Sequence, residues 1–411
     1  MEQLRERNCG LDVHQRIVVA FFMSGRGARV KRECRTFGTS RRQLEALRDW
    51  LISEGCTHVV MESTGVYWRP VYRVLEGHFE LTVANAHHVK NVPGRKTDTK
   101  DSEWVCLLDR HGLVSKSLVP SRELESLREL LRYRRSVLAA RTAERNRVLK
   151  LLESLNIKLS SVLSDVFGVS GWRILQALRD GVRDPEALAA LADPSVRRRK
   201  LGLLIEALEA PLDEDGQFLL SQQMRTLEGL DRSVEELEER IKLRIKPYEE
   251  QIKLLDTIPG IDWILAATIV SEIGTDMTIF TTAARLAAWA GMCPGNNMTG
   301  GKRRRARARK GNVHLKTALT SAAVSASRSK DGGYLRDKYY RSKAKQGPQY
   351  AAVIVGHRIL TAAFHILSKM QPYKDLGSDY LDQVAKTKTI ANYKRRIERL
   401  GYHVTLQPIA A

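Results

Sequence analysis

Hydrophobic and polar positions alternate in the first hundred residues in short stretches that are typical of strands separated by helices. Leu11–Phe22 predicts one strand, a turn and a second strand, and Arg29–Phe37 alternates like a third, exposed strand. A helix is expected from Ser40, because the leucines after it recur at helical spacing. The next elements are expected in the order strand, helix, strand and helix, over His58–Met61, Val66–Leu75, Glu80–Ala84 and from Thr97 to about His111. Periodicity by itself therefore predicts an α/β fold for this part of the chain.

Two long helices are predicted after residue 120, each with an apolar stripe at heptad spacing. The stripes consist of Leu124, Leu127, Leu131, Leu138, Val148, Leu152 and Leu155, and of Leu220, Met224, Leu227, Leu230, Val234, Leu237 and Ile241. Arg134, Arg141 and Arg145 interrupt the first stripe, and Pro247 ends the second helix. Because neither helix can bury its stripe alone, we expect an antiparallel hairpin or an intermolecular coiled coil. Residues 156–216 between them predict a small helical insertion.

The C-terminal third is predicted to be mainly helical and to contain one glycine-rich loop. It opens with the turn Thr257–Ile261, which is similar to a helix-hairpin-helix turn that meets a phosphate, although an ordinary helix-connecting turn explains it equally well. The helices are expected to end near Ile273 and to span Leu286–Gly291, His314–Ser329 and Gln349–Met370. The loop covers Cys293–Gly301, and the polar tail after Lys374 carries little signal.

Length and composition limit the possible classes of protein. The 411 residues predict two or three domains of ~100–200 residues each, and a hydrophobic content of 43% excludes global disorder. No apolar run approaches the ~18–20 residues that span a membrane, so we expect neither a membrane nor a secreted enzyme. The five cysteines are scattered without a CxxC pair, which argues against a disulfide framework or a zinc knuckle. We expect a reduced, cytoplasmic protein.

The net charge of +21 is concentrated in one region. Residues 302–370 hold 17 Lys and Arg residues against two acids, a net charge of +15, whereas residues 1–120 carry only +5. The densest cations are Lys302, Arg303, Arg304, Arg305, Arg307, Arg309 and Lys310. Such a block repels itself unless a polyanion neutralises it, and it lies inside the chain instead of in a terminal tail. It therefore predicts binding to the phosphate backbone of nucleic acid.

Four acids occupy positions that favour a metal site. Asp12 lies inside the first apolar strand, where an unpaired charge is costly, and Glu62 directly follows the buried strand His58–Met61. Asp98 and Asp101 lie three residues apart at a helix start, so both can face one side of its first turn. Clustered carboxylates repel each other unless a cation bridges them, and hard oxygen ligands suit Mg²⁺ and phosphoryl transfer.

Each acid also has a purely structural explanation. Asp98 and Asp101 could cap their helix, which is the simpler explanation for that pair alone. Glu62 could bond to the turn that follows it. Asp12 is the hardest to explain without a ligand, and the combination of all four favours the metal site.

Long sequence strings resemble one known family. Gly10–Val13, Met61–Trp68 (with ESTGVYW), Asn85–Asp101 (with VPGRKTDTKD) and much of Ile258–Asn312 resemble the DEDD-type transposases of the insertion-sequence-110 family. The order of three strands and then alternating helices and strands is that of an RNase H-like domain. The resemblance implies a RuvC-like metal-binding domain over 1–120, coiled-coil helices with an insertion over 121–256, a C-terminal transposase domain over 257–375, and a tail over 376–411.

The resemblance implies an RNA-guided DNA recombinase. Such proteins excise and insert their own element, guided to double-stranded target and donor DNA by a structured non-coding bridge RNA. Four acids, here Asp12, Glu62, Asp98 and Asp101, are expected to hold Mg²⁺ or Mn²⁺ near the scissile phosphate. Dimers, joined here by the heptad helices, are expected to assemble into a tetramer on DNA, in the bacterial cytoplasm with the nucleoid.

The expected nucleophile differs from the family pattern. A serine of the C-terminal domain attacks the phosphate in the family, whereas the matching hydroxyl here is that of Thr299. Its extra methyl group crowds the approach to phosphorus. Ser321 is the next candidate. Two other functions therefore remain open: a RuvC-type nuclease that uses metal-activated water on branched DNA, and an inactive transposase-derived protein that only binds nucleic acid.

Overall fold

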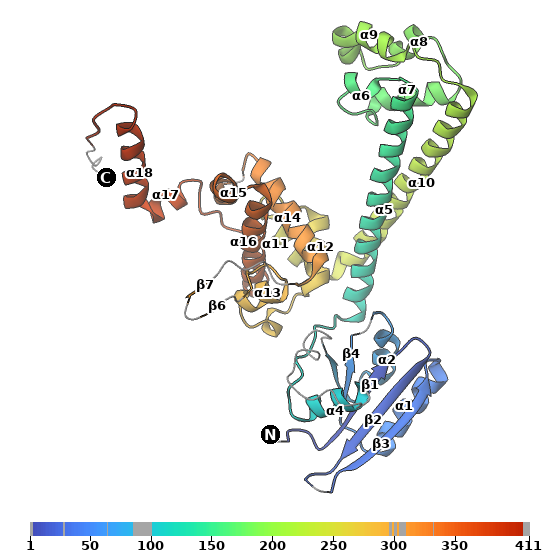
Figure 1. Ribbon diagram of the computed structural model, residues 1–411, viewed down its shortest axis with the longest axis vertical. Helices are drawn as coiled ribbons and strands as arrows, with labels where there is room; N and C mark the ends of the chain where they lie inside the picture. Colours follow the sequence, from blue (N-terminus) through green and yellow to red (C-terminus); the bar gives the residue numbers. More distant parts are fainter. Residues whose placement is uncertain are drawn as a thin grey trace. The chain divides into compact units, whose positions relative to one another are not determined.

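The computed structural model describes residues 3–27, 29–63, 65–84, 101–295, 298–299, 302–303, 310–331 and 333–405. The chain divides into two compact units, Met1–Val119 and Pro120–Ala411 (Figure 1). The first unit contains the predicted sheet, and the second is mostly helical.

The N-terminal unit is built on a mixed sheet of five strands. The strands are β1 (Arg7–Val13), β2 (Ile17–Ser24), β3 (Lys31–Gly38), β4 (His58–Glu62) and β5 (Glu80–Ala84), in the spatial order β3-β2-β1-β4-β5. The pairs β1–β2 and β2–β3 are antiparallel, whereas β1–β4 and β4–β5 are parallel. The described helices of this unit are α1 (Arg41–Ser53), α2 (Trp68–Leu75) and α4 (Asp101–Arg110). This order is consistent with the predicted RNase H-like fold.

Side-chain alternation gives the sheet two different faces. Leu11 of β1 and Met61 of β4 are fully buried in the main core of this unit, together with Leu47 of α1 and Leu75 of α2. The intervening residues face the other side of the sheet. There, Val60 packs with Ala84 and with two residues of α4, Val105 and Leu108. Helix α4 therefore covers the opposite face from α1 and α2.

The two heptad helices pair within the chain. They are α5 (Arg122–Ser154) and α10 (Glu214–Ile245), which run side by side in Figure 1. Arg134 donates to Glu238 at 2.9 Å and Arg141 donates to Asp231 at 2.8 Å. Along α5, residues with higher numbers therefore meet residues of α10 with lower numbers. The pair is therefore an antiparallel hairpin. Two of the arginines that interrupt the predicted stripe, Arg134 and Arg141, form these cross-helix ion pairs, whereas Arg145 lies over the ring of Phe167.

Four short helices form the insertion between α5 and α10. They are α6 (Leu159–Val162), α7 (Val169–Arg179), α8 (Pro185–Ala190) and α9 (Pro194–Leu208). They share one core with the adjoining ends of the hairpin, including Leu152 of α5 and Leu220 of α10, which are almost completely buried.

The remainder of the second unit is a helical domain. Its elements are η1 (Lys246–Tyr248), α11 (Glu249–Asp256), α12 (Trp263–Ile273), η2 (Met277–Ile279), α13 (Ala283–Trp289), β6 (Met298–Thr299), β7 (Lys302–Arg303), α14 (Val313–Arg328), α15 (Gly333–Gln346), α16 (Pro348–Lys369), α17 (Tyr380–Val384) and α18 (Lys386–Glu398). The sequence patterns did not predict the hairpin of β6 and β7, nor α15, α17 and α18. The tail expected to carry little signal contains two of these helices.

The turn resembling a helix-hairpin-helix element packs inside this domain. Gly260 has a φ of +85°, and a Cβ atom there would lie 2.4 Å from the carbonyl oxygen of Ala322 and 2.4 Å from the amide of Ala326. Ile258 and Ile261 beside it are buried. Because this side of the turn rests on α14, the packing favours the ordinary helix-connecting turn.

Helix α16 corrects the expectation about apolar runs. Among the described helices, its 22 residues alone are long and apolar enough to cross a membrane. The sequence pattern missed this because single polar residues interrupt the run. More than half of the apolar stretch is buried, and the helix packs against α14 and α15. This burial is typical of the central helix of a folded domain.

Candidate functional site

Asp12 and Glu62 lie side by side on the face of the sheet that α4 covers. Leu11 of β1 pairs with Met61 of the parallel β4, and each acid is the next residue of its strand. Since Leu11 and Met61 point into the main core, alternation turns both carboxylates to the opposite face. Two acids far apart in sequence are thus brought together by the register of two parallel strands.

A glycine allows α4 to lie close to β1. A Cβ atom on Gly10 would lie 2.2 Å from the carbonyl oxygen of Ser102 and 2.6 Å from the amide of Cys106, so no other residue fits without a shift. Asn8 donates from Nδ2 to the carbonyl of Cys106 at 2.9 Å, and Arg110 donates to the carbonyl of Glu6 at 3.2 Å. Helix α4 therefore runs antiparallel to β1, and its N-terminus lies at the same end of the sheet as Asp12.

This orientation brings the third acid to the same end of the sheet. Asp101 is the first residue of α4 and is exposed there. A buried polar group holds the far end of the helix: Asp109, which is 1% exposed, is bonded by Arg5 and by Asn8. Sequence reasoning missed this group, although a glycine inside an apolar strand does signal the close approach of α4.

The described acids lie at the same end of the sheet, but they do not form a complete metal-binding site. Asp12 is partly exposed, and its Oδ2 lies 2.9 Å from Nε2 of His14. Within the described ranges, no group of three or more His, Cys, Asp and Glu side chains is arranged to hold a metal ion. Asp98, the fourth predicted ligand, lies outside the described residues. Carboxylate oxygens suit Mg²⁺ chemically, but the three described carboxylates, of Asp12, Glu62 and Asp101, do not by themselves enclose an ion.

The predicted nucleophile lies in a loop whose two ends touch. A Cβ atom on Gly311 would lie 2.4 Å from the amide of Gly291, so the chain leaves α13 and returns to α14 at nearly the same point. Between these ends, Thr299 of β6 pairs with Lys302 of β7. The hairpin therefore places the backbone of the threonine directly opposite the first cation of the basic block.

Only part of the basic block lies among the described residues. Lys302 and Arg303 form β7, and Lys310 is exposed just before α14. The other predicted contacts to nucleic acid lie outside the described residues: Arg304, Arg305, Arg307 and Arg309.

A buried carboxylate fixes the end of this loop. Asn312 caps α14 by accepting from the amide of Leu315 at 3.0 Å, and its Nδ2 donates to Glu272 at 2.6 Å. Glu272 of α12 is 1% exposed and also accepts two bonds of 2.9 Å from Arg132 of α5. Helix α5, helix α12 and the loop are thus joined by one side chain, which the sequence patterns did not single out.

Comparison with known proteins identifies both parts of this arrangement. Residues 9–157 match a family of DEDD transposases of the IS110 group, described as "Transposase". Residues 252–341 match the family described as "Transposase IS116/IS110/IS902 family". The chain is a transposase, with two segments that match domain families of the IS110 group. A "Probable family 20 transposase" of Pseudomonas aeruginosa is 27% identical over 288 residues, which cover 69% of this chain and 75% of that protein.

The predicted site residues are divided between the two matched segments. The first includes the sheet and α4 with the acids, and the second includes the loop with Thr299. The predicted enzyme class, a transposase, is thereby confirmed. The metal, the nucleophile and the guide RNA stay predictions.

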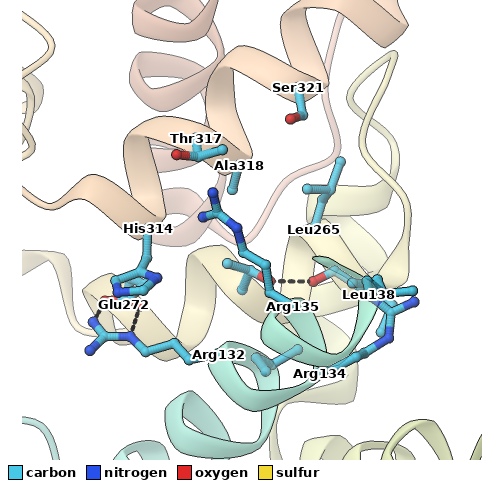
Figure 2. A pocket seen from close by; sticks show the side chains of 13 residues that line it. Arg132, Arg134, Arg135, Leu138, Leu265, Glu272, His314, Thr317, Ala318 and Ser321 are labelled. Atoms are coloured by element: carbon cyan, nitrogen blue, oxygen red, sulfur yellow. Dashed lines mark hydrogen bonds and ion pairs between the residues drawn. The ribbon is translucent and has the colours of Figure 1, made fainter. Parts of the chain in front are cut away.

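Ser321, the alternative candidate for the nucleophile, lines a cavity. Ser321 is exposed on α14 and lies at a cavity of about 270 Å³ between α5, α12 and α14 (Figure 2). His314, one side of which faces the same cavity, has a buried Nδ1 that forms no hydrogen bond with the described residues. Burial, and secondarily the charge of Arg132, lowers the pKa of His314, so its imidazole is neutral at pH 7.

Proposed function

We propose that this transposase cuts and rejoins DNA strands, with Asp12, Glu62, Asp98 and Asp101 around the scissile phosphate and Thr299 as the nucleophile. The main support is the position of three of these acids at one end of the RNase H-like sheet, to which the strand register and the orientation of α4 bring them. The hairpin that pairs Thr299 with Lys302 supports the second half of the proposal.

The proposed chemistry is a reversible phosphoryl transfer. The hydroxyl oxygen of Thr299 forms a bond to phosphorus, the bond from phosphorus to one strand end breaks, and that end leaves as a hydroxyl after taking up the proton that the threonine loses. A new strand end then reverses the step and releases the threonine. No net bond energy is lost, so strands are rejoined without an external energy source.

The acids would hold Mg²⁺ or Mn²⁺ through Asp12, Glu62 and Asp101, with Asp98 as the fourth ligand. When bound, the ion would neutralise charge on the phosphate oxygens. The acidic ligands and the cations of the basic block would then both act on one phosphate.

Trapping of a covalent adduct tests the nucleophile. We expect wild-type protein and Thr299→Ser to form protein–DNA adducts in denaturing gels and Thr299→Ala to form none, with Ser321→Ala as the matched control that still forms them. Adducts that persist in Thr299→Ala and disappear in Ser321→Ala would assign the attack to Ser321. Metal-dependent cleavage without any adduct would instead support the RuvC-type nuclease.

We further propose that a bridge RNA encoded by the element directs the protein to target and donor DNA, and that dimers assemble into a tetramer on them. Support comes from the family resemblance and from the basic block, which contacts backbone and carries little sequence information. Sequencing of RNA that co-purifies with the protein tests the guide. One discrete RNA from beside the gene is expected, whereas a random mixture of cellular RNA would contradict the proposal.

A further inference from the structure

The cavity between α5, α12 and α14 combines an apolar floor with a cation, Arg135, that pairs with no described residue. Leu138, Leu265 and Ala318 contribute apolar surface. In Figure 2, the side chain of Arg135 reaches from α5 toward Thr317 and Ala318. This composition is typical of a site for a ligand that is flat and apolar in one part and anionic in another.

Arg135 differs from two neighbouring arginines of α5 in having no counter-charge among the residues that the structure describes. Arg132 is held by Glu272, and Arg134 is held by Glu238. In the part of the chain that the structure describes, Arg135 forms neither a hydrogen bond nor an ion pair. An arginine that lies beside a cavity and is not paired with a carboxylate is available to an anion. Its planar guanidinium group suits phosphate oxygens.

Polar groups of α14 face the same space. The hydroxyl of Ser321 forms no hydrogen bond with any described residue, so it can donate to a phosphate oxygen. His314 lines the same cavity with a neutral ring, whose Nδ1 is buried and forms no hydrogen bond with any described residue. By contrast, the one carboxylate of the cavity, Glu272, is already saturated by Arg132 and Asn312 and does not repel an anion strongly.

We propose that this cavity binds one unpaired nucleotide of the nucleic acid on which the transposase acts. Its base would rest on Leu138 and Leu265, and its phosphate would contact Arg135 and Ser321. Apolar pockets receive bases that leave a stack, and arginine commonly holds the adjoining phosphate. The proposal rests on the proposed function and extends it, because it assigns a second contact outside the reacting phosphate.

The position of the cavity favours a nucleic-acid strand over a free small anion. Glu272 in its wall bonds Asn312, the first residue after the loop that carries Thr299 and the basic block. Lys310, two residues before Asn312, is exposed and would hold a strand near this wall of the cavity. The surplus charge of residues 302–370 also matches a polyanion.

Photo-crosslinking locates the nucleotide directly. The full-length protein would be irradiated with single-stranded ten-residue oligothymidylate or oligouridylate that carries one central 5-bromouracil, and the crosslinked peptide identified by mass spectrometry. We expect crosslinks to peptides of α5, α12 or α14 that line the cavity, and the DNA and RNA probes show which strand it prefers. Crosslinks confined to other segments would overturn the proposal.

Binding measurements separate the phosphate contact from the base contact. We expect Arg135→Ala to weaken oligonucleotide binding about tenfold and to lower the slope of log K against log salt by about 0.7, the value for one lost phosphate contact on a single strand. Leu265→Trp, which fills the cavity without changing charge, should weaken binding and leave the slope unchanged. Arg122→Ala, an exposed arginine of the same helix, is the matched control.

The outcomes distinguish this proposal from the proposed function. All variants are first compared in thermal unfolding, so that loss of fold is recognised. Equal affinities for Arg135→Ala and Arg122→Ala would overturn the cavity proposal and leave strand transfer through Thr299 intact. If Arg135→Ala changes the oligomeric state of the protein in solution and leaves its oligonucleotide affinity unchanged, a second copy of the chain occupies the cavity. That result would also overturn the cavity proposal. If Thr299→Ala keeps the cavity crosslink while losing DNA adducts, both proposals are supported independently.

Discussion

At the scale of single residues, Glu272 illustrates why a buried charge can be essential to a fold. Its carboxylate is 1% exposed and is bonded by Arg132 and Asn312, with Arg128 at 3.4 Å. Removing a charge from water is costly unless several partners replace the water, and here they do. The same side chain joins α5 and α12 to the end of the loop that carries Thr299.

Replacing this carboxylate should destabilise the C-terminal unit. We expect Glu272→Gln to lower the free energy of unfolding by about 3 kcal/mol, because two arginines lose their counter-charge in a buried site. Urea denaturation followed by circular dichroism measures the effect. Glu239→Gln, an exposed acid of α10, is the control and should change stability by less than about 0.5 kcal/mol. Equal stabilities of the two variants would contradict the role given to Glu272.

His314 should make stability depend on pH. Burial is the largest cause that lowers its pKa, followed by Arg132, while Glu272 opposes the shift and Arg135 and Arg128 add to it. The unfolded chain therefore binds this proton more readily than the folded protein, so stability falls as pH drops below the usual ~6.5 of histidine. We expect His314→Gln to flatten the dependence of the unfolding temperature on pH between about 7 and 5. An unchanged profile in the variant would exclude this histidine as the cause.

At the scale of elements, the position of α4 decides whether the acids meet. The helix crosses β1 at Gly10 and is anchored by Asn8 and Asp109 at its far end. Asp101 thereby lies at the end of the sheet where Asp12 and Glu62 adjoin. A small change in this crossing would move one carboxylate relative to the other two.

A methyl group at this crossing should therefore affect both stability and activity. We expect Gly10→Ala to lower the free energy of unfolding by about 3 kcal/mol, since the added Cβ would meet backbone atoms of α4 at 2.2 Å and 2.6 Å. Gly38→Ala is the control, because its Cβ would meet only the flexible side chain of Gln43, at 3.2 Å. Thermal denaturation and a DNA cleavage assay measure the two effects. A Gly10→Ala variant as stable and as active as Gly38→Ala would show that α4 does not depend on this contact.

Elements with strong periodicity were predicted well, and those without it were missed. The strand Glu80–Ala84 was predicted with its observed bounds, and α16 within one residue at each end. Helix α15 is polar over most of its length, so its pattern is weak, although Tyr334 and Leu335 are buried by α14 and α16. The two-residue strands β6 and β7 are too short for any periodicity to reveal.

At the scale of the whole molecule, positive charge is separated from the acids along the sequence. Residues 302–370 carry +15 of the net +21, whereas the unit that contains Asp12, Glu62 and Asp101 is nearly balanced. Cations that release condensed counterions from nucleic acid produce binding that weakens steeply with salt.

Binding to DNA should accordingly depend strongly on ionic strength. We expect the affinity for a 30-base-pair duplex, measured by fluorescence anisotropy, to fall by about 10³–10⁵ between ~50 and ~200 mM salt, as for 6–10 phosphate contacts. Replacing Lys302, Arg303 and Lys310 together by glutamine should lower the slope. A slope that stays the same in this variant would place the main contacts on cations other than these three.

The sequence by itself determined the local elements, the family and the candidate chemistry. Apolar periodicity depends on which residues a helix or strand must bury, so it can be read without coordinates, and Asp12 stood out because a charge within an apolar strand needs a reason. The antiparallel pairing of α5 with α10 was one of two possibilities, and only the cross-helix ion pairs decided it.

Only the tertiary structure decided which distant residues meet. The register of β1 on β4 places Asp12 beside Glu62, and the close approach at Gly10 orients α4. Likewise, the bonds of Glu272 and the cavity beside Arg135 join residues from three helices far apart in sequence. Such contacts depend on packing and on the satisfaction of buried polar groups, which act through space and leave no period in the sequence.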